Sequence, residues 1–277
     1  MIRQILWEFF FYKNLCAYFY SMILHPGTPL AFIPKKIISL VPSQTELLHY
    51  LGLEAETVAI TKFCIHPKSW YRSKTKVGGT KTLNLQNIKK LQPDLIIANK
   101  EENVKGQIDE LAKDFNVLVT DVNTLEEAFD MIIDIGLLTG TSVAANKLSE
   151  KIKNDFAAFH LPKEKIDIAY LIWNNPYMAA GGGTFINDIL TRCGFKNVFA
   201  NMPRYPQVTT AQLHTANCKL LLLSTEPYPF KQKHINELQE QLPHTKILLV
   251  DGEMFSWYGS RMLQMPEYLQ QLVNSER

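Results

Sequence analysis

The sequence lacks the marks of several large classes of protein. Its four cysteines form no C-x-x-C pair and have no regular spacing, so they indicate no disulfide framework and leave the redox compartment open. The 29 Lys and Arg residues nearly balance the 27 Asp and Glu residues, which argues against a nucleic-acid-binding surface. No G-x-S-x-G, H-E-x-x-H or nucleotide-binding fingerprint is present. We therefore predict a protein that is not an enzyme and does not bind nucleic acid.

The first 24 residues are rich in aromatic side chains but interrupted by charge. The longest uncharged piece, residues 14–24, is too short to span a bilayer, and no small-residue cleavage site follows it cleanly. Three interpretations stay open: a weak export signal or anchor, an accessory aromatic helix, or residues that precede a true start at Met22. We assign residues 1–35 to an N-terminal extension of uncertain status. The encoded chain is expected in the cytoplasm, with the periplasm as the alternative.

One pattern of short apolar runs and helical segments occurs twice between Lys36 and Asp251. Such alternation is typical of parallel sheets with helices packed on both faces. The sequence therefore predicts an α/β fold of two doubly wound lobes, with a ligand held in the cleft that separates them. The predicted domains are an N-terminal lobe over 36–123, a bridging helix over 124–160 and a C-terminal lobe over 161–277.

The bridging segment is predicted to be a single long helix. Thr124 and Glu127 have the spacing of a capping box, and apolar residues recur at helical spacing as far as Phe156. A helix of about 30 residues would be about 45 Å long. The one place where it could bend lies between Gly136 and Gly140.

The other elements follow from apolar periodicity and from the turn residues that bound it. Ser43 is predicted to be the N-cap of the first helix, with Glu46 at its third position. The predicted strands include 36–41, 58–61, 95–98, 117–121 and 247–251, and the predicted helices include 45–53, 85–91, 101–115 and 185–193. Residues 211–223 are predicted to be a helix that runs into a buried strand.

Ligands of open parallel sheets lie outside the carboxyl ends of the strands, so the residues that follow each strand are the candidates for a binding site. Most of these residues are aromatic or basic, which suits a large flat ligand or an anionic one. Lys62 and Arg204 add to this cationic character. The candidate ligand-binding residues are Phe63, Cys64, His66, Thr80, Lys81, Asn99, Lys100, Trp173, Tyr205, Trp257, Tyr258 and Arg261.

Each candidate also has a simpler interpretation. Cys64 and His66 could face the same side of an extended segment as metal ligands, but two ligands do not complete a site, and a packed thiol beside a hydrogen-bonded imidazole is the alternative. The run from Gly181 to Thr184 could cradle an anion or form a tight turn. The aromatic residues could belong to the core, and the cations could be solvated. No metal site and no catalytic residue are predicted.

Three segments resemble one known family. They are residues 37–48 (Ile-Ile-Ser-Leu-Val-Pro-Ser-Gln-Thr-Glu-Leu-Leu), residues 83–98 and residues 205–209. These segments are similar to the periplasmic cobalamin-binding proteins, which belong to the helical-backbone metal-chelate receptors that serve ABC importers. The resemblance extends from about Lys36 to Leu272. It implies two α/β lobes joined by one long helix. It also implies a monomer that captures a corrinoid or ferric chelate, has no covalent cofactor and has an ABC permease as its partner.

The resemblance also carries over to single residues. It places Phe63, Trp173 and Tyr205 at aromatic walls of the ligand site, and residues 253–261 in the last ligand-binding loop. Thr80 and Asn99 stand where the family has tryptophans, with lysines beside them, so the site is expected to be more polar and more basic.

The family's docking glutamates, one in each lobe, correspond here to Gln86 and Ala211. This departure keeps open an alternative function, a cytosolic ligand-sensing or interaction protein that retains the fold without a transport role.

Overall fold

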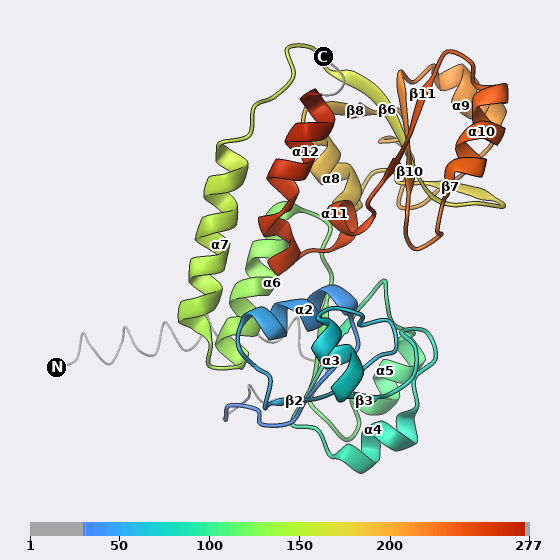
Figure 1. Cartoon of the computed structure of the whole chain (residues 1–277). Coiled ribbons are helices and arrows are strands. Elements are labelled where there is room, and N and C mark those ends of the chain that lie inside the picture. Colours follow the sequence, from blue (N-terminus) through green and yellow to red (C-terminus); the bar gives the residue numbers. More distant parts are fainter. Residues whose placement is uncertain (1–29, 31, 275–277) are drawn as a thin grey trace. The chain divides into compact units, whose positions relative to one another are not determined.

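The computed structural model describes Leu30 and residues 32–274, which form two compact units (Figure 1). Described residues within 1–121 and 131–146 belong to unit 1, and those within 122–130 and 147–277 belong to unit 2. The predictions for the first 24 residues, including Met22 as a start site, lie outside the described residues. Of the predicted extension 1–35, only Leu30 and residues 32–35 are described.

Unit 1 contains one parallel sheet with the strand order β3-β2-β1-β4-β5. The central strands β1 and β4 are fully buried, as expected of a sheet covered on both faces. Because all five strands are parallel, their carboxyl ends lie at the same end of the sheet, which we call the unit 1 edge. The strands are β1 (Ile37–Ser39), β2 (Thr57–Ile60), β3 (Thr75–Lys76), β4 (Leu95–Asn99) and β5 (Val117–Thr120).

The helices of unit 1 are α2 (Pro42–Tyr50), α3 (Lys68–Ser73), α4 (Leu85–Leu91) and α5 (Lys105–Leu111). Helices α4 and α5 share one face of the sheet, where Lys89 Nζ pairs with Glu110 at 3.0 Å and Asp114 at 2.8 Å. The right-handed crossover rule places α2 and α3 on the opposite face. Apolar residues on both sets of helices are buried, so unit 1 has the doubly wound architecture that the sequence predicts.

Two helix starts in unit 1 differ from the predictions. Helix α2 begins at Pro42 with Val41 as its N-cap and no capping side chain, so the prediction of Ser43 as N-cap is wrong. Proline at the first helical position needs no acceptor for an N–H group, which accounts for the earlier start. Helix α5 begins at Lys105 rather than at 101, because Asn99 Oδ1 accepts from the N–H groups of Glu101 and Glu102 and holds that segment in a turn.

Unit 2 contains a mixed sheet with the order β11-β10-β6-β7-β9, and β8 pairs with the first half of β6. Strands β6, β8, β10 and β11 are parallel, whereas β7 is antiparallel to β6 and to β9. The strands are β6 (Ile166–Trp173), β7 (Tyr177–Ala179), β8 (Phe195–Asn197), β9 (Gln207–Val208), β10 (Leu220–Ser224) and β11 (Lys246–Val250).

A hairpin joins β6 to β7, and its turn contains Asn175 in the left-handed region at φ 61°. Asparagine tolerates this conformation better than most residues, so the sequence Asn174-Asn175-Pro176 suits a tight reversal. The remaining elements of unit 2 are mainly helical. They are α8 (Phe185–Arg192), α9 (Thr210–Ala216), α10 (Gln232–Gln241), α11 (Glu253–Ser256), the 3₁₀ helix η1 (Ser260–Leu263) and α12 (Met265–Asn274).

The segment predicted as one long helix consists of two, α6 (Leu125–Leu138) and α7 (Ser142–Ala157), so the prediction of a single bridging helix is corrected. Gly140 adopts φ 73° just after α6, and Thr141 N–H donates to Gly136 O at 2.7 Å, which is a typical helix C-terminus. A Cβ on Gly136 would lie 2.3 Å from Ala145 Cβ, so the absent side chain lets the start of α7 pack directly on α6. The two helices therefore turn back on each other.

Across the described residues, none of the helices combines the length and the apolar character that a membrane crossing needs.

Candidate functional site

The predicted site residues of unit 1 come from three loops at the unit 1 edge. Phe63 follows β2, and a Cβ on Gly79 of the second loop would lie 3.0 Å from its ring. Lys62 N–H donates to Gly78 O at 2.8 Å, which joins the same two loops. Asn103, in the loop after β4, donates from Nδ2 to Thr80 O at 3.1 Å. The three loops thus form one continuous surface within unit 1.

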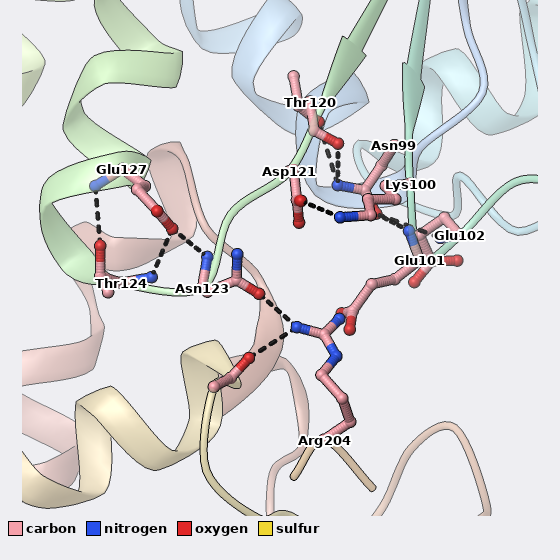
Figure 2. Close-up of polar contacts among 11 residues, drawn as sticks. Asn99, Lys100, Glu101, Glu102, Thr120, Asp121, Asn123, Thr124, Glu127 and Arg204 are labelled. Atoms are coloured by element: carbon pink, nitrogen blue, oxygen red, sulfur yellow. Dashed lines mark hydrogen bonds and ion pairs between the residues drawn. The ribbon is translucent and has the colours of Figure 1, made fainter.

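Asn99, at the end of β4, holds this surface in place (Figure 2). Its Nδ2 donates to Thr120 O at 2.9 Å and to Thr120 Oγ1 at 3.1 Å. Its Oδ1 accepts from the N–H groups of Glu101 at 2.9 Å and Glu102 at 3.1 Å. Asn99 is 2% exposed, and both the amide nitrogen and the amide oxygen of its side chain have hydrogen-bond partners within the protein, as buried polar groups require. Asn99 therefore shapes the unit 1 edge.

Cys64 lies beneath the surface rather than on it. Its Sγ is 3.1 Å from Thr45 Oγ1 and 3.2 Å from Thr61 Oγ1, and its side chain is fully buried. Burial raises the pKa of the Cys64 thiol, because the thiolate would lose its hydration. The structure thus shows the packed thiol that the sequence left as an alternative. His66 is half-buried before the cis Pro67.

Among the residues that the structure describes, no three Cys, His, Asp or Glu side chains are placed so that they could hold a metal ion.

The lysines of the unit 1 edge differ in how far their charge is neutralised. Lys100 Nζ pairs with Asp121 at 2.5 Å, and Lys81 Nζ donates to the backbone carbonyl of Glu101. Lys62 Nζ lies 5.2 Å from the centre of the Phe63 ring, a cation–π distance. Phe63 itself is 52% exposed. This edge therefore offers an exposed aromatic ring beside a cation, while Lys100 is paired with an acidic side chain.

Trp173 belongs to an aromatic group at the carboxyl ends of β6 and β10 in unit 2. Its ring centre is 5.7 Å from that of Tyr228. Tyr228 Oη accepts from Asn174 Nδ2 at 3.2 Å and lies 3.2 Å from His234 Nε2. Trp173 is 40% exposed, so the group holds a ring that faces solvent. Sequence reasoning places Tyr228 after a strand end but missed His234 as part of this group, because only the fold brings α10 to the end of β6.

The loop after β11 is packed and internally neutralised. Arg261 pairs with Glu253 at 3.1 Å, and its guanidinium lies 5.2 Å from the centre of the Trp257 ring. The Tyr258 ring is 5.6 Å from that of Phe185 in α8. Trp257, Tyr258 and Arg261 are all buried residues. These three predicted site residues are thus gathered in one cluster of unit 2, with the positive charge of Arg261 balanced.

Arg204 fixes the position of Tyr205. Its Nη1 donates to Asn123 Oδ1 at 2.5 Å and to Gly183 O at 2.6 Å (Figure 2), and the guanidinium lies 5.9 Å from the Tyr205 ring centre. In the adjacent glycine run, Gly181 N–H donates to Arg204 O at 2.7 Å and Gly182 N–H to Met202 O at 2.8 Å. Because these two amides already have backbone acceptors, they are not available to an anion, and this half of the run is held against the segment from Met202 to Arg204.

Comparisons with known proteins agree with this architecture. The sequence pattern of a family described as periplasmic binding protein matches residues 37–243. A vitamin B12-binding protein of Photorhabdus laumondii is 26% identical over 250 residues, which are 87% of this chain and 88% of that protein. The resemblance to cobalamin-binding proteins inferred from the sequence is thereby confirmed.

Solved structures with the same fold include two proteins of Vibrio cholerae. The periplasmic vitamin B12-binding protein BtuF superposes with a TM-score of 0.71 at 20% identity, covering 87% of this chain and 97% of that one. The periplasmic heme-binding protein HutB gives a TM-score of 0.73 at 22% identity, covering 86% and 98%. These neighbours establish the two-lobed α/β fold class of periplasmic binding proteins for this chain.

Proposed function

Because this chain belongs to the periplasmic binding protein family, we propose that it captures a metal-chelate cofactor, a corrinoid first and a ferric chelate second. The observation that carries the proposal is the vitamin B12-binding relative, whose similarity extends over 87% of this chain and so includes both units. An exposed aromatic ring in each unit, Phe63 and Trp173, supports it, because a large flat ligand is held by stacking. The chain is proposed to act as a non-enzymatic receptor.

We further propose delivery to an ABC-type importer, with the protein in the periplasm. The family name favours the periplasmic alternative over the cytoplasmic expectation. A lipoprotein of Bacillus subtilis that is described as an ABC transporter substrate-binding protein is 25% identical over 87% of this chain.

One observation favours the second candidate, a ligand-sensing protein without a transport role. Gln86 and Ala211 lie in the first turns of α4 and α9, both exposed, and neither first turn contains an acidic residue. The docking glutamates implied by the family resemblance are therefore missing from these positions. Fractionation of native cells separates the candidates: a transport role places the protein outside the cytoplasmic membrane, and a sensing role places it in the cytoplasm.

The proposed ligand class is tested by calorimetry. The purified chain is titrated with cyanocobalamin, heme and a ferric hydroxamate, and with cobalt and iron salts as controls. We expect saturable one-to-one binding of at least one chelate, with a Kd of about 1 μM or lower, because stacking on aromatic side chains and burial of a large ring are both favourable. The free metal salts should give no comparable heat. Absence of binding by every chelate would overturn the proposal.

A further inference from the structure

Glu102 stands out at the unit 1 edge once the polar groups around it are accounted for. Asn99, Lys100 and Cys64 all have protein partners. The Glu102 carboxyl group accepts no hydrogen bond and forms no ion pair with any residue in the described part of the chain. Because Glu102 is only half-buried, this acceptor without a protein partner is accessible to a hydrogen-bond donor that comes from outside the protein.

The backbone around Glu102 is firmly held. Its N–H donates to Asn99 Oδ1 at 3.1 Å, and the next residue, Asn103, accepts from Asn99 N–H at 2.9 Å (Figure 2 shows Glu102 beside Asn99 and Lys100). Asn103 also donates to Thr80 O, which ties this loop to its neighbour. The carboxyl group is therefore presented from a preorganised loop, as a ligand-contacting residue requires.

The surroundings of Glu102 are partly desolvated. The residue is half-buried, and burial raises the pKa of its carboxyl group, while the positive charge of Lys81 acts in the opposite direction. The Lys81 ammonium itself donates to the Glu101 carbonyl rather than to Glu102. A half-buried carboxylate is less fully hydrated than one in water, so a hydrogen-bond donor supplied by a ligand would stabilise its charged form.

We infer that Glu102 is a specificity-determining residue of the proposed ligand site: its carboxyl group accepts a hydrogen bond from an amide N–H or a hydroxyl on the ligand and disfavours a ligand that presents a carboxylate there. The inference rests on the proposed function and names the chemistry of its ligand. The site therefore selects chelates with a neutral, amide-bearing rim. The sequence favours an anionic ligand as well as a flat one, and the pairing of Lys100 with Asp121 and of Arg261 with Glu253 reduces the positive charge that an anionic ligand would meet.

The test uses one scaffold in two forms, cyanocobalamin and its purified monocarboxylate hydrolysis products, in which a single side-chain amide becomes a carboxylate. Binding is measured by calorimetry for the wild-type chain, Glu102→Gln and Glu102→Ala. Glu110→Gln in α5 is the matched control, since it removes one negative charge that is paired with Lys89 and Lys113. Each variant is also melted without ligand to establish that it is folded.

We expect the wild type to bind cyanocobalamin at least about 10-fold more tightly than one of the monocarboxylates, a ratio typical of a hydrogen bond to a charged group. Glu102→Ala should weaken cyanocobalamin binding about 10-fold and narrow that ratio. Glu102→Gln keeps a hydrogen-bond acceptor, so its loss of cyanocobalamin affinity should be smaller than that of Glu102→Ala. It should also reduce the ratio of cyanocobalamin affinity to monocarboxylate affinity. Glu110→Gln should change neither the cyanocobalamin affinity nor this ratio by more than about 2-fold.

If both Glu102 variants bind cyanocobalamin and discriminate against the monocarboxylates like the wild type, the inference falls and the proposed function stands. If the wild type binds no chelate, both fall.

The melting temperature of Glu102→Gln without ligand is expected to change in one direction. The raised pKa means that the folded protein binds the Glu102 proton more tightly than the unfolded chain does, so the stability linked to this group is greatest below the usual pKa of 4.5 and falls as pH rises through the raised value. Glu102→Gln has no group to ionise at this position, so it does not lose this stability as the pH rises. Its Tm without ligand should therefore equal or exceed that of the wild type at pH 7, with the difference vanishing near pH 4.

Discussion

Replacing Asn99 by alanine is expected to lower the free energy of unfolding by about 2 to 3 kcal/mol. The substitution removes the donor to Thr120 and the acceptor of the Glu101 and Glu102 N–H groups, and it does so at a buried position. Breaking a buried hydrogen-bond network is one of the few single changes with an effect of this size. Urea denaturation followed by circular dichroism measures it.

Asn146→Ala is the control for this prediction. Asn146 is exposed on α7, and its side chain donates one hydrogen bond, from Nδ2 to Ser142 O at 2.8 Å. Its removal should change the unfolding free energy by no more than about 0.5 kcal/mol. If Asn99→Ala were as mild as Asn146→Ala, the loop after β4 would not depend on the Asn99 side chain, and our account of the unit 1 edge would be wrong.

Asn99 also marks a limit of sequence reasoning about the site. The rule that ligands lie beyond strand ends singled out Asn99, and the structure places it at the end of β4. The same rule cannot tell a side chain that faces a ligand from one that bonds its own loop. Glu102, three residues further on, was not a candidate, because its lack of a partner becomes visible only when Asn103 and the neighbouring loops are in place.

Replacing Phe63 by alanine should weaken binding of the chelate by about 5- to 150-fold, or about 1 to 3 kcal/mol, as expected for a desolvated aromatic anchor. Its ring is 52% exposed at the unit 1 edge and rests against Gly79, so a flat ligand would cover an apolar surface that is otherwise in water. The affinity is measured by titration calorimetry with the chelate found to bind best.

Tyr71→Ala provides the comparison for Phe63. Tyr71 is 42% exposed in α3, within the same unit, and its ring contacts Lys76 rather than the loops of the edge. Loss of this ring should leave the affinity within about 2-fold. Equal and small effects of the two substitutions would remove Phe63 from the ligand site while leaving the fold assignment intact.

More of the fold than of the site could be predicted, because strands and helices are recognised from local patterns in the sequence. Residues 95–98 and 220–223 are continuous apolar runs, and both lie in fully buried strands. The break between α6 and α7 depends on Gly136 lying against Ala145, a contact that periodicity does not show. The β6–β7 hairpin was missed for a similar reason, since its antiparallel pairing follows from the conformation of Asn175 rather than from the apolar pattern.

The charge of the site shows the same limit. The sequence predicts converging cations, but it does not reveal that Arg261 is paired with Glu253 and stacked on Trp257, or that Lys100 is paired with Asp121. Asp121 follows a different strand from Lys100, whereas Glu253 and Arg261 both follow β11 and meet only because the chain between them folds back. Only the folded chain shows how much positive charge is left for a ligand.

The most direct test of the proposed function is the metal content of the native protein. The chain is purified by gel filtration from the cells that produce it, without chelators, and its absorbance spectrum and its cobalt and iron content are measured before and after unfolding in urea. We predict that cobalt or iron elutes with the protein in a ratio approaching one, together with the visible absorbance of a corrin or an iron chelate, and that both are released on unfolding. A protein that elutes without metal or chromophore, and that binds none of the chelates when they are added back, would contradict the account.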